Sequence, residues 1–144
     1  MNQINDISHV ITVATAPVFL LMAVVSALGV LTARLARIVD RARVLDRQAE
    51  AADDLELTNV HGDLAVLARR AKLVNGAITL AVCCALCVCG VIVMLFVDAV
   101  LQADNSQLIA LLFVLAMLCF IAALAGFLRE TYLATVGLRF GRRR

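Results

Sequence analysis

A run of 24 uncharged residues, from Val10 to Ala33, most constrains what this chain can fold into. At 1.5 Å per residue, a helix of that length crosses a hydrocarbon layer of about 30 Å. The densely charged segment that follows, from Arg34 to Arg47, keeps a helical pattern without a break. We therefore expect one long helix, with its first part in lipid and its second part in water.

Two further apolar runs, Ala77–Val97 and Leu108–Leu128, follow in the 144-residue chain, of which 63% is hydrophobic. An ordinary soluble domain is nearer half apolar. The first nine residues lack Lys and Arg, so they do not resemble the basic start of a signal peptide, and the first run is expected to stay as an anchor. The sequence predicts an all-α membrane protein with three transmembrane helices, the first extended into a cytoplasmic antiparallel helical hairpin.

The basic residues predict the topology, because Lys and Arg concentrate on the cytoplasmic side of a membrane. Eight of the 13 lie between Arg34 and Lys72 and five lie from Arg129 onward, whereas none precedes the first run or lies in 98–107. The predicted order is a short extracytoplasmic N-terminus (1–9), transmembrane helix 1 (10–33), a cytoplasmic helical hairpin (34–76), transmembrane helix 2 (77–97), an extracytoplasmic loop (98–107), transmembrane helix 3 (108–128) and a basic cytoplasmic tail (129–144).

The hairpin is predicted from two apolar seams with alternating steps of three and four residues, the spacing that keeps side chains on one face of a helix. The first seam is Leu35, Ile38, Ala42, Leu45, Ala49 and Ala52, and the second is Leu57, Val60, Leu64, Leu67, Ala71 and Val74. Asp40 lies three residues from Arg37 and Arg43, and Asp46 lies three from Arg43, so intrahelical ion pairs are expected there.

Small residues in the second and third runs predict close helix packing, because they let helices approach each other in lipid. The predicted packing stripes are Gly76, Thr79, Cys83, Cys87 and Gly90 in the second run, and Ala116, Cys119, Ala123 and Gly126 in the third. The spacing Cys84-x-x-Cys87 matches a redox or metal motif, but no His or carboxylate lies nearby. All five cysteines are therefore interpreted as packing residues, and no metal or cofactor is expected.

One face of the first helix carries its polar and small residues, and two interpretations of it stay open. It is either a helix contact face or the lining of a narrow pathway along the axis of a homo-oligomer. In the second interpretation Asp6 forms an acidic outer ring, Phe19 and Met22 form a dry constriction, and arginines stand at the inner mouth. The candidate pore-lining residues are Asp6, Thr12, Thr15, Phe19, Met22, Ser26, Gly29, Arg34, Arg37 and Arg41.

Four runs, TAPVFLL, LTARLARIVDRAR, LARRAKLVNGAI and FLRETYLA, resemble a widespread bacterial family of small membrane proteins named domain of unknown function 2721. The likeness extends from about Ile7 to Leu138, and IVDRAR, Ile38 to Arg43, is its most specific part. The resemblance implies a multi-pass protein of the bacterial inner membrane. It carries over no catalytic or ligand-binding residue, and the cysteine cluster is not a feature associated with the family.

Two classes of function are disfavoured by the absence of charge from the three predicted spans. An enzyme needs an acid, base or activated nucleophile in a sheltered site, and a proton-coupled transporter usually needs a carboxylate or His within the membrane. The remaining hypotheses are a homo-oligomeric ion channel lined by the first helix and, alternatively, a non-catalytic scaffold or regulatory module whose hairpin binds an unknown protein. The expected partners are the lipid bilayer, further copies of the chain and anionic lipid at the basic tail, without nucleic acid.

Overall fold

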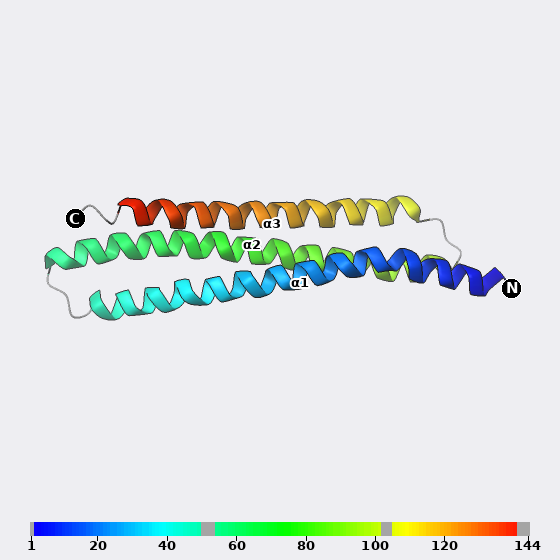
Figure 1. The fold of residues 1–144 in the computed structure, drawn as a ribbon, viewed down its shortest axis with the longest axis horizontal. Helices are drawn as coiled ribbons and strands as arrows, with labels where there is room; N and C mark the ends of the chain where they lie inside the picture. The colour runs from blue at the N-terminus through cyan, green and yellow to red at the C-terminus, as the bar shows by residue number, and fades with distance from the viewer. Residues whose placement is uncertain (1, 50–53, 102–104, 141–144) are drawn as a thin grey trace. The chain divides into compact units, whose positions relative to one another are not determined.

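Three long α-helices make up the computed structural model, which describes residues 2–49, 54–101 and 105–140. The helices are α1 (Asn2–Ala49), α2 (Asp54–Leu101) and α3 (Ser106–Phe140) (Figure 1). Each contains a stretch long and apolar enough to cross a membrane: Ile11–Ala49, Gly62–Leu101 and Ser106–Ala134. The predicted all-α class and the three apolar helices are confirmed, and the chain is a multi-pass membrane protein.

Each helix continues through the point where its apolar run meets its charged segment. The first helix runs past Ala33 without interruption, as the unbroken periodicity predicted, and Pro17 lies inside it. The second includes both Gly62 and Gly76. The third extends beyond Leu128 as far as Phe140, so the first part of the predicted basic tail is helical. The last four residues, with Arg142 to Arg144, lie outside the described residues.

The chain divides into two compact units, and every helix contributes to both. Unit 1 consists of Met1–Leu28 and Leu80–Ala122, and unit 2 consists of Gly29–Thr79 and Ala123–Arg144. Each unit therefore contains one segment from each of the three helices. The two units are described separately below.

Small and β-branched side chains form the core of unit 1. Its buried residues are Ala14, Pro17 and Val24 of α1, Ala81, Cys84, Val88 and Val91 of α2, and Ala116 of α3. The predicted packing stripe of the second run does not carry the main contacts here: Cys83 is exposed, Cys87 and Gly90 are only half-buried, and a Cβ added at Gly90 would meet nothing within 4 Å. The buried residues of α2 form another series with the same three-four spacing, which also contains small residues, and this series carries the contacts instead: Ala81, Cys84, Val88 and Val91.

A carboxylate joins the end of α2 to the start of α3 in unit 1. Asp98 accepts a hydrogen bond from the Asn105 side-chain amide at 2.7 Å and one from the Asn105 backbone N–H at 3.3 Å. The Asn105 carbonyl in turn accepts from the backbone N–H groups of Leu108 and Ile109 in the first turn of α3. Asn105 therefore anchors the beginning of α3, where the first backbone N–H groups of a helix lack intrahelical partners.

The core of unit 2 contains Leu31 and Ile38 of α1, Leu67, Val74 and Ala77 of α2, and Ala123 and Glu130 of α3. A Cβ added at Gly126 would lie 3.6 Å from the Ala77 Cβ, an ordinary van der Waals distance. The predicted stripe of the third run is therefore confirmed, because Ala116 and Ala123 are buried and Cys119 and Gly126 are half-buried. Gly76, in the predicted stripe of α2, is exposed.

The apolar seams of the charged segments are the least exposed positions of those segments. In α1, Leu35, Ala42, Leu45 and Ala49 are half-buried and Ile38 is buried, whereas their charged neighbours from Arg37 to Arg47 are exposed. In α2, Val60, Leu64 and Ala71 are half-buried and Leu67 and Val74 are buried. Ala52 and the side chain of Leu57 lie outside the described residues.

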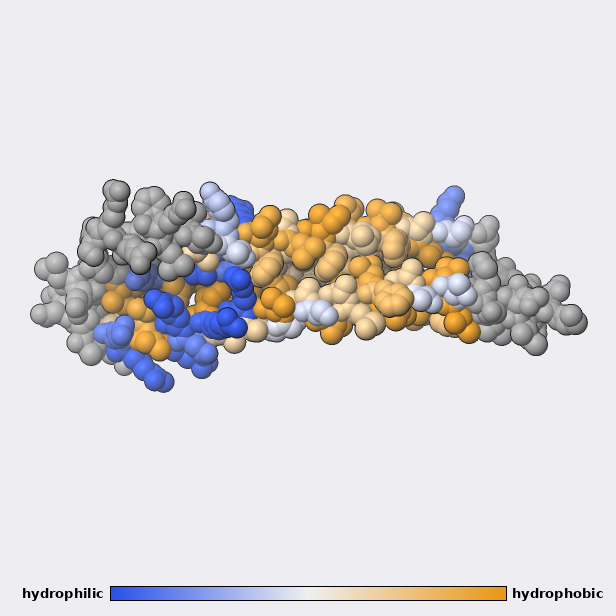
Figure 2. Space-filling view, in the orientation of Figure 1, coloured by the Kyte–Doolittle hydropathy of each residue, from blue (hydrophilic) through white to orange (hydrophobic). Residues whose placement is uncertain are grey.

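The predicted intrahelical ion pairs of α1 are absent: the ion pairs found among the described residues both involve Glu130, and neither includes Asp40 or Asp46. Exposed pairs of this kind gain little, because water screens both charges and the long side chains lose freedom when they are held together. Figure 2 shows a cluster of hydrophilic residues over part of the visible face and a mostly hydrophobic surface over the apolar segments.

Candidate functional site: an arginine pocket around a buried glutamate

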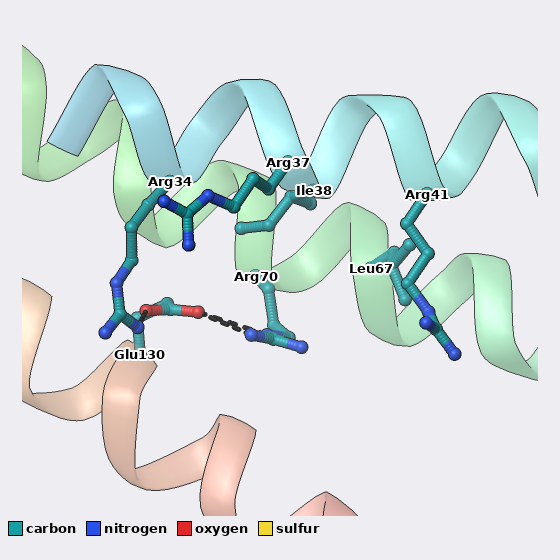
Figure 3. A pocket seen from close by; sticks show the side chains of 7 residues that line it. All are labelled: Arg34, Arg37, Ile38, Arg41, Leu67, Arg70 and Glu130. Carbon is teal, nitrogen blue, oxygen red and sulfur yellow. Dashed lines mark hydrogen bonds and ion pairs between the residues drawn. The ribbon is translucent and has the colours of Figure 1, made fainter. Parts of the chain in front are cut away.

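Glu130 is fully buried and connects α3 to both other helices within unit 2. Its Oε1 accepts hydrogen bonds from Arg70 of α2, at 2.7 Å from Nη2 and 3.2 Å from Nε. Its Oε2 accepts a hydrogen bond from Nη1 of Arg34 of α1 at 3.2 Å. Figure 3 shows both guanidinium groups pointing toward the carboxylate from different helices.

The three charged residues meet because each lies close to the end of an apolar run. Arg34 comes directly after the first run, Arg70 precedes the second by seven residues, and Glu130 follows the third by two. The Arg34 guanidinium also lies 5.1 Å from the centre of the Phe127 ring, one turn before Glu130 on α3. That distance suits a cation–π contact, so Arg34 has two separate contacts with α3.

A carboxylate with no exposure needs such partners, because burying an unpaired charge is strongly unfavourable. Both oxygens of Glu130 accept from guanidinium groups, and within the described residues no buried side-chain nitrogen or oxygen lacks a hydrogen-bond partner. The arginines are partly exposed at the surface, with 37% of the Arg34 side chain and 25% of the Arg70 side chain accessible. The cluster therefore links three helices at one point while its positive groups remain partly accessible.

A cavity of about 350 Å³ opens beside this cluster, and we refer to it as the arginine pocket. It is lined by Arg34, Arg37, Ile38, Arg41, Leu67, Arg70 and Glu130 (Figure 3). Ile38 and Leu67 are core residues of unit 2, so the pocket has an apolar base and charged walls.

Positive charge dominates the arginine pocket. Four guanidinium groups and a single carboxylate line it, which leaves an excess of three positive charges. Glu130 is paired with Arg34 and Arg70, whereas Arg37 and Arg41 take part in neither of the two ion pairs found among the described residues. Both are exposed. Like charges around one cavity repel each other, and this arrangement favours an anion in the pocket.

The candidate pore-lining residues of the apolar part of α1 lie on an exposed face of the helix. Thr12, Thr15, Ser26 and Gly29 are exposed, and the exposed fractions of Phe19 and Met22 are 65% and 62%. The Thr15 hydroxyl donates to the Ile11 carbonyl at 3.0 Å, as a threonine facing lipid commonly does. The side chain of Asp6 lies outside the described residues, and the pore-lining role itself stays a prediction.

The arginines of the candidate pore line a cavity to which no residue of that exposed stripe contributes. Arg34, Arg37 and Arg41 line the pocket within unit 2 together with residues of α2 and α3. At about 100° per residue, their mean direction is turned by roughly 60° from the face that carries Phe19 and Met22. Arg34 is committed to Glu130 and Phe127. Among the described candidates, Thr12, Thr15, Phe19, Met22, Ser26 and Gly29 thus lie on an exposed face of α1, whereas the three arginines line the pocket.

The five cysteines are free thiols. Cys84 is buried, Cys87 and Cys119 are half-buried, and Cys83 and Cys89 are exposed. Within the described part of the chain, no group of three or more His, Cys, Asp or Glu residues could hold a metal ion. The interpretation of the cysteines as packing residues thus fits Cys84 best, since it belongs to the core of unit 1.

Sequence reasoning missed Glu130 and Arg70 as site residues, although a signal for Glu130 was present. The small stripe Ala116, Cys119, Ala123, Gly126 advances by three, four and three residues, and one further step of four reaches Glu130. Glu130 is also the sole acidic residue after Asp104. A lone carboxylate in register with a packing stripe predicts a buried ion pair, because packing carries it into the core.

Comparison with known families agrees with the sequence resemblance. The family model described as "Protein of unknown function (DUF2721)" matches residues 14–140. The chain belongs to the DUF2721 family. All the residues of the arginine pocket lie inside the matched range. The comparison with curated proteins and that with solved structures each find no match.

Proposed function

We propose that this DUF2721 protein is a non-catalytic membrane module in which unit 2, with its charged segments, binds a negatively charged partner. The observation that carries the proposal is the arginine pocket, in which one carboxylate offsets only one of four guanidinium charges. Its shape is maintained by the ion pairs of Glu130 with two different helices. A preorganised set of positive groups lowers the entropic cost of binding an anion.

The composition of the pocket supports binding rather than catalysis. Its lining consists of arginine, isoleucine, leucine and the doubly paired Glu130, with no Ser, Cys, His or Lys. A guanidinium group stays protonated in proteins, so it is a poor general acid or base. Glu130 has both oxygens engaged by arginines. Such a site is suited to hold and orient an anion.

The positive-inside rule supports placing the charged segments of α1 and α2 in the cytoplasm as an antiparallel hairpin, in the inner membrane of a bacterium. A reporter fused after Arg144 and another at Ala51 should then both read cytoplasmic. In a variant without native cysteines, a cysteine at Asn105 should react with an impermeant thiol reagent in intact cells. Labelling of that cysteine only after lysis would contradict this orientation.

The module proposal is tested by polyanion binding. The purified protein in phosphatidylcholine nanodiscs is titrated with polyglutamate and with inorganic polyphosphate at low salt. We expect at least one to bind, and the variant with Arg37→Glu and Arg41→Glu to lose that binding because its pocket carries four fewer positive charge units. Absence of binding by both polyanions would refute the proposal.

A homo-oligomeric channel is the second candidate, and the exposure of the α1 stripe favours it. Phe19 and Met22 are more than half exposed in the protomer, so they are available to a second copy or to lipid. In this proposal the stripes of several copies surround an axial pathway, with Asp6 at the outer mouth. Because Arg34 is engaged by Glu130, the inner mouth would depend on other groups.

Flux through liposomes distinguishes the two proposals. The module predicts ion flux no greater than that of empty liposomes, for the native protein and for Phe19→Ser alike. The channel predicts a measurable flux that Phe19→Ser increases, because a hydroxyl admits water to a dry constriction. The mass in detergent adds an independent test, since a monomer that persists in nanodiscs would exclude a pathway between copies.

A further inference from the structure

We infer that the arginine pocket is a binding site for a phosphate group, with Arg37 and Arg41 as its recognition residues. The inference rests on the proposed function and names the chemistry of the anion at the same site. It follows from the division of the four arginines into two that are fixed and two that are available.

Arg34 and Arg70, which we call the inner pair, are held in place by contacts within the protein. Arg70 donates twice to Oε1 of Glu130 and Arg34 donates to Oε2, while Arg34 also stacks against Phe127. Both residues line the cavity, but these contacts already set the positions of their guanidinium groups. This leaves the inner pair as a rigid, positively charged wall.

Arg37 and Arg41, which we call the outer pair, are available for a ligand. Arg37 and Arg41 extend from successive turns of α1 at the same cavity, and in Figure 3 no dashed line joins either of them to another of the pocket residues drawn. The nearest acidic residue on the same helix, Asp40, is exposed and forms no ion pair with them. In Figure 3 the two guanidinium groups point to different sides of the pocket, that of Arg37 toward Arg34 and that of Arg41 past Leu67. Without a carboxylate partner, each can donate paired hydrogen bonds from its fork to the oxygens of a phosphate.

The size and position of the pocket indicate which phosphates fit. A volume of about 350 Å³ is near the lower limit for small-molecule sites, so it accommodates a headgroup or a small phosphate compound. Arg34 directly follows the apolar run of α1, which places the pocket beside the segment that enters lipid. Two sources share the required chemistry: the headgroup of an anionic phospholipid and a soluble phosphate.

The test compares two double variants with the same change in charge. Arg37→Ala with Arg41→Ala removes the recognition residues, and Arg43→Ala with Arg47→Ala removes two exposed arginines of the same helix that do not line the pocket. Neither pair contacts Glu130, so both double variants should unfold thermally like the native protein. Pyrophosphate binding is measured by calorimetry in detergent, and phosphatidylglycerol retention is measured by native mass spectrometry.

The inference predicts that the pocket variant loses affinity for pyrophosphate, or retention of phosphatidylglycerol, by about tenfold or more, because several charge-assisted hydrogen bonds disappear. The control variant should change by less than about threefold. Retention of the lipid without binding of pyrophosphate identifies a headgroup site, and the opposite result identifies a soluble ligand. A variant with Arg37→Lys and Arg41→Lys should show a smaller loss, since it keeps the charge without the planar fork.

Three outcomes would overturn the inference. Equal losses in the two double variants would mean that net charge, and not the pocket, attracts phosphate. Tricarballylate binding as tightly as pyrophosphate would refute phosphate recognition and leave the anionic-partner proposal intact. Absence of both pyrophosphate binding and lipid retention would refute the phosphate site, while polyglutamate binding would still decide the proposed function separately.

Discussion

Unit 1 and unit 2 each bury one residue of α3 completely, but the two residues have opposite chemistry. In unit 1 the residue is Ala116, and in unit 2 it is Glu130, two heptads further along the same helix. The alanine permits close approach and contributes van der Waals contact. The glutamate contributes two ion pairs, which depend on guanidinium groups from two other helices.

The cavities of the two units also differ in the polarity of the residues that line them. Unit 1 has a cavity of about 480 Å³ lined mostly by apolar residues, among them Val13, Val91 and Phe113. In unit 2 the arginine pocket, about 350 Å³, is lined mostly by charged residues. A single helical framework thus provides apolar packing in one unit and an ion-pair cluster in the other. A position in the packing register sets burial, whereas the neighbouring helices decide which chemistry that burial tolerates.

The largest effect should follow from placing a glutamate, such as the one buried in unit 2, at the buried alanine position of unit 1. Ala116→Glu would bury a carboxylate among apolar side chains, so we expect destabilisation by more than about 4 kcal/mol and loss of the folded protein. Ala116→Leu, which adds volume without charge, should cost about 1–3 kcal/mol. Protein levels in the membrane and unfolding in mixed detergent measure the difference. Equal effects of the two substitutions would show that volume alone matters at this position.

The reciprocal change, Glu130→Ala, should destabilise unit 2 by about 2–4 kcal/mol, because it leaves Arg34 and Arg70 close together without their carboxylate. Partial exposure of both arginines keeps the expected effect below that of a fully buried ion pair. In a double-mutant cycle, the combined variant Glu130→Ala and Arg70→Ala should lose less unfolding free energy than the sum of the losses in the two single variants. Strict additivity, measured by chemical unfolding, would mean that the ion pair contributes nothing.

The predicted apolar seam can be tested at two adjacent residues of α2, of which only Leu67 belongs to the seam. Leu67 is buried and Val66 is 57% exposed. We expect Leu67→Asp to destabilise the protein by about 2–4 kcal/mol, whereas Val66→Asp should change the free energy of unfolding by less than about 0.5 kcal/mol. Hydrogen exchange of the α1 and α2 segments in unit 2 provides the measurement. Similar exchange in the two variants would contradict the pairing of the seams.

The smallest effects are expected at two glycines of unit 2. A Cβ at Gly76 would meet nothing within 4 Å, so Gly76→Ala should leave stability unchanged or raise it by up to about 1 kcal/mol. Gly126 faces Ala77, so Gly126→Leu should destabilise the protein while Gly76→Leu is tolerated. Thermal unfolding of the two leucine variants distinguishes them. If Gly76→Leu were the more destabilising of the two, the predicted packing stripe that contains Gly76 would be supported instead.

The sequence by itself determined the membrane class and the helices. The uncharged run from Val10 to Ala33 requires a spanning helix because an unpaired backbone is too costly in lipid. It also predicted the seam from Leu35 to Ala49, because apolar residues stand out there against charged neighbours. The same face of α1 continues as Ala14, Pro17, Val24 and Leu31, all buried, but in an apolar run no contrast in polarity marks it.

Only the tertiary structure decided which faces are buried within the apolar runs and which charges meet. Gly76 and Ala77 are adjacent, and spacing alone does not say which of them faces another helix. Arg34, Arg70 and Glu130 are separated by 36 and 60 residues, so no local pattern joins them. Their meeting depends on the lengths and registers of three helices together, which is why the arginine pocket emerges from packing and not from any single segment.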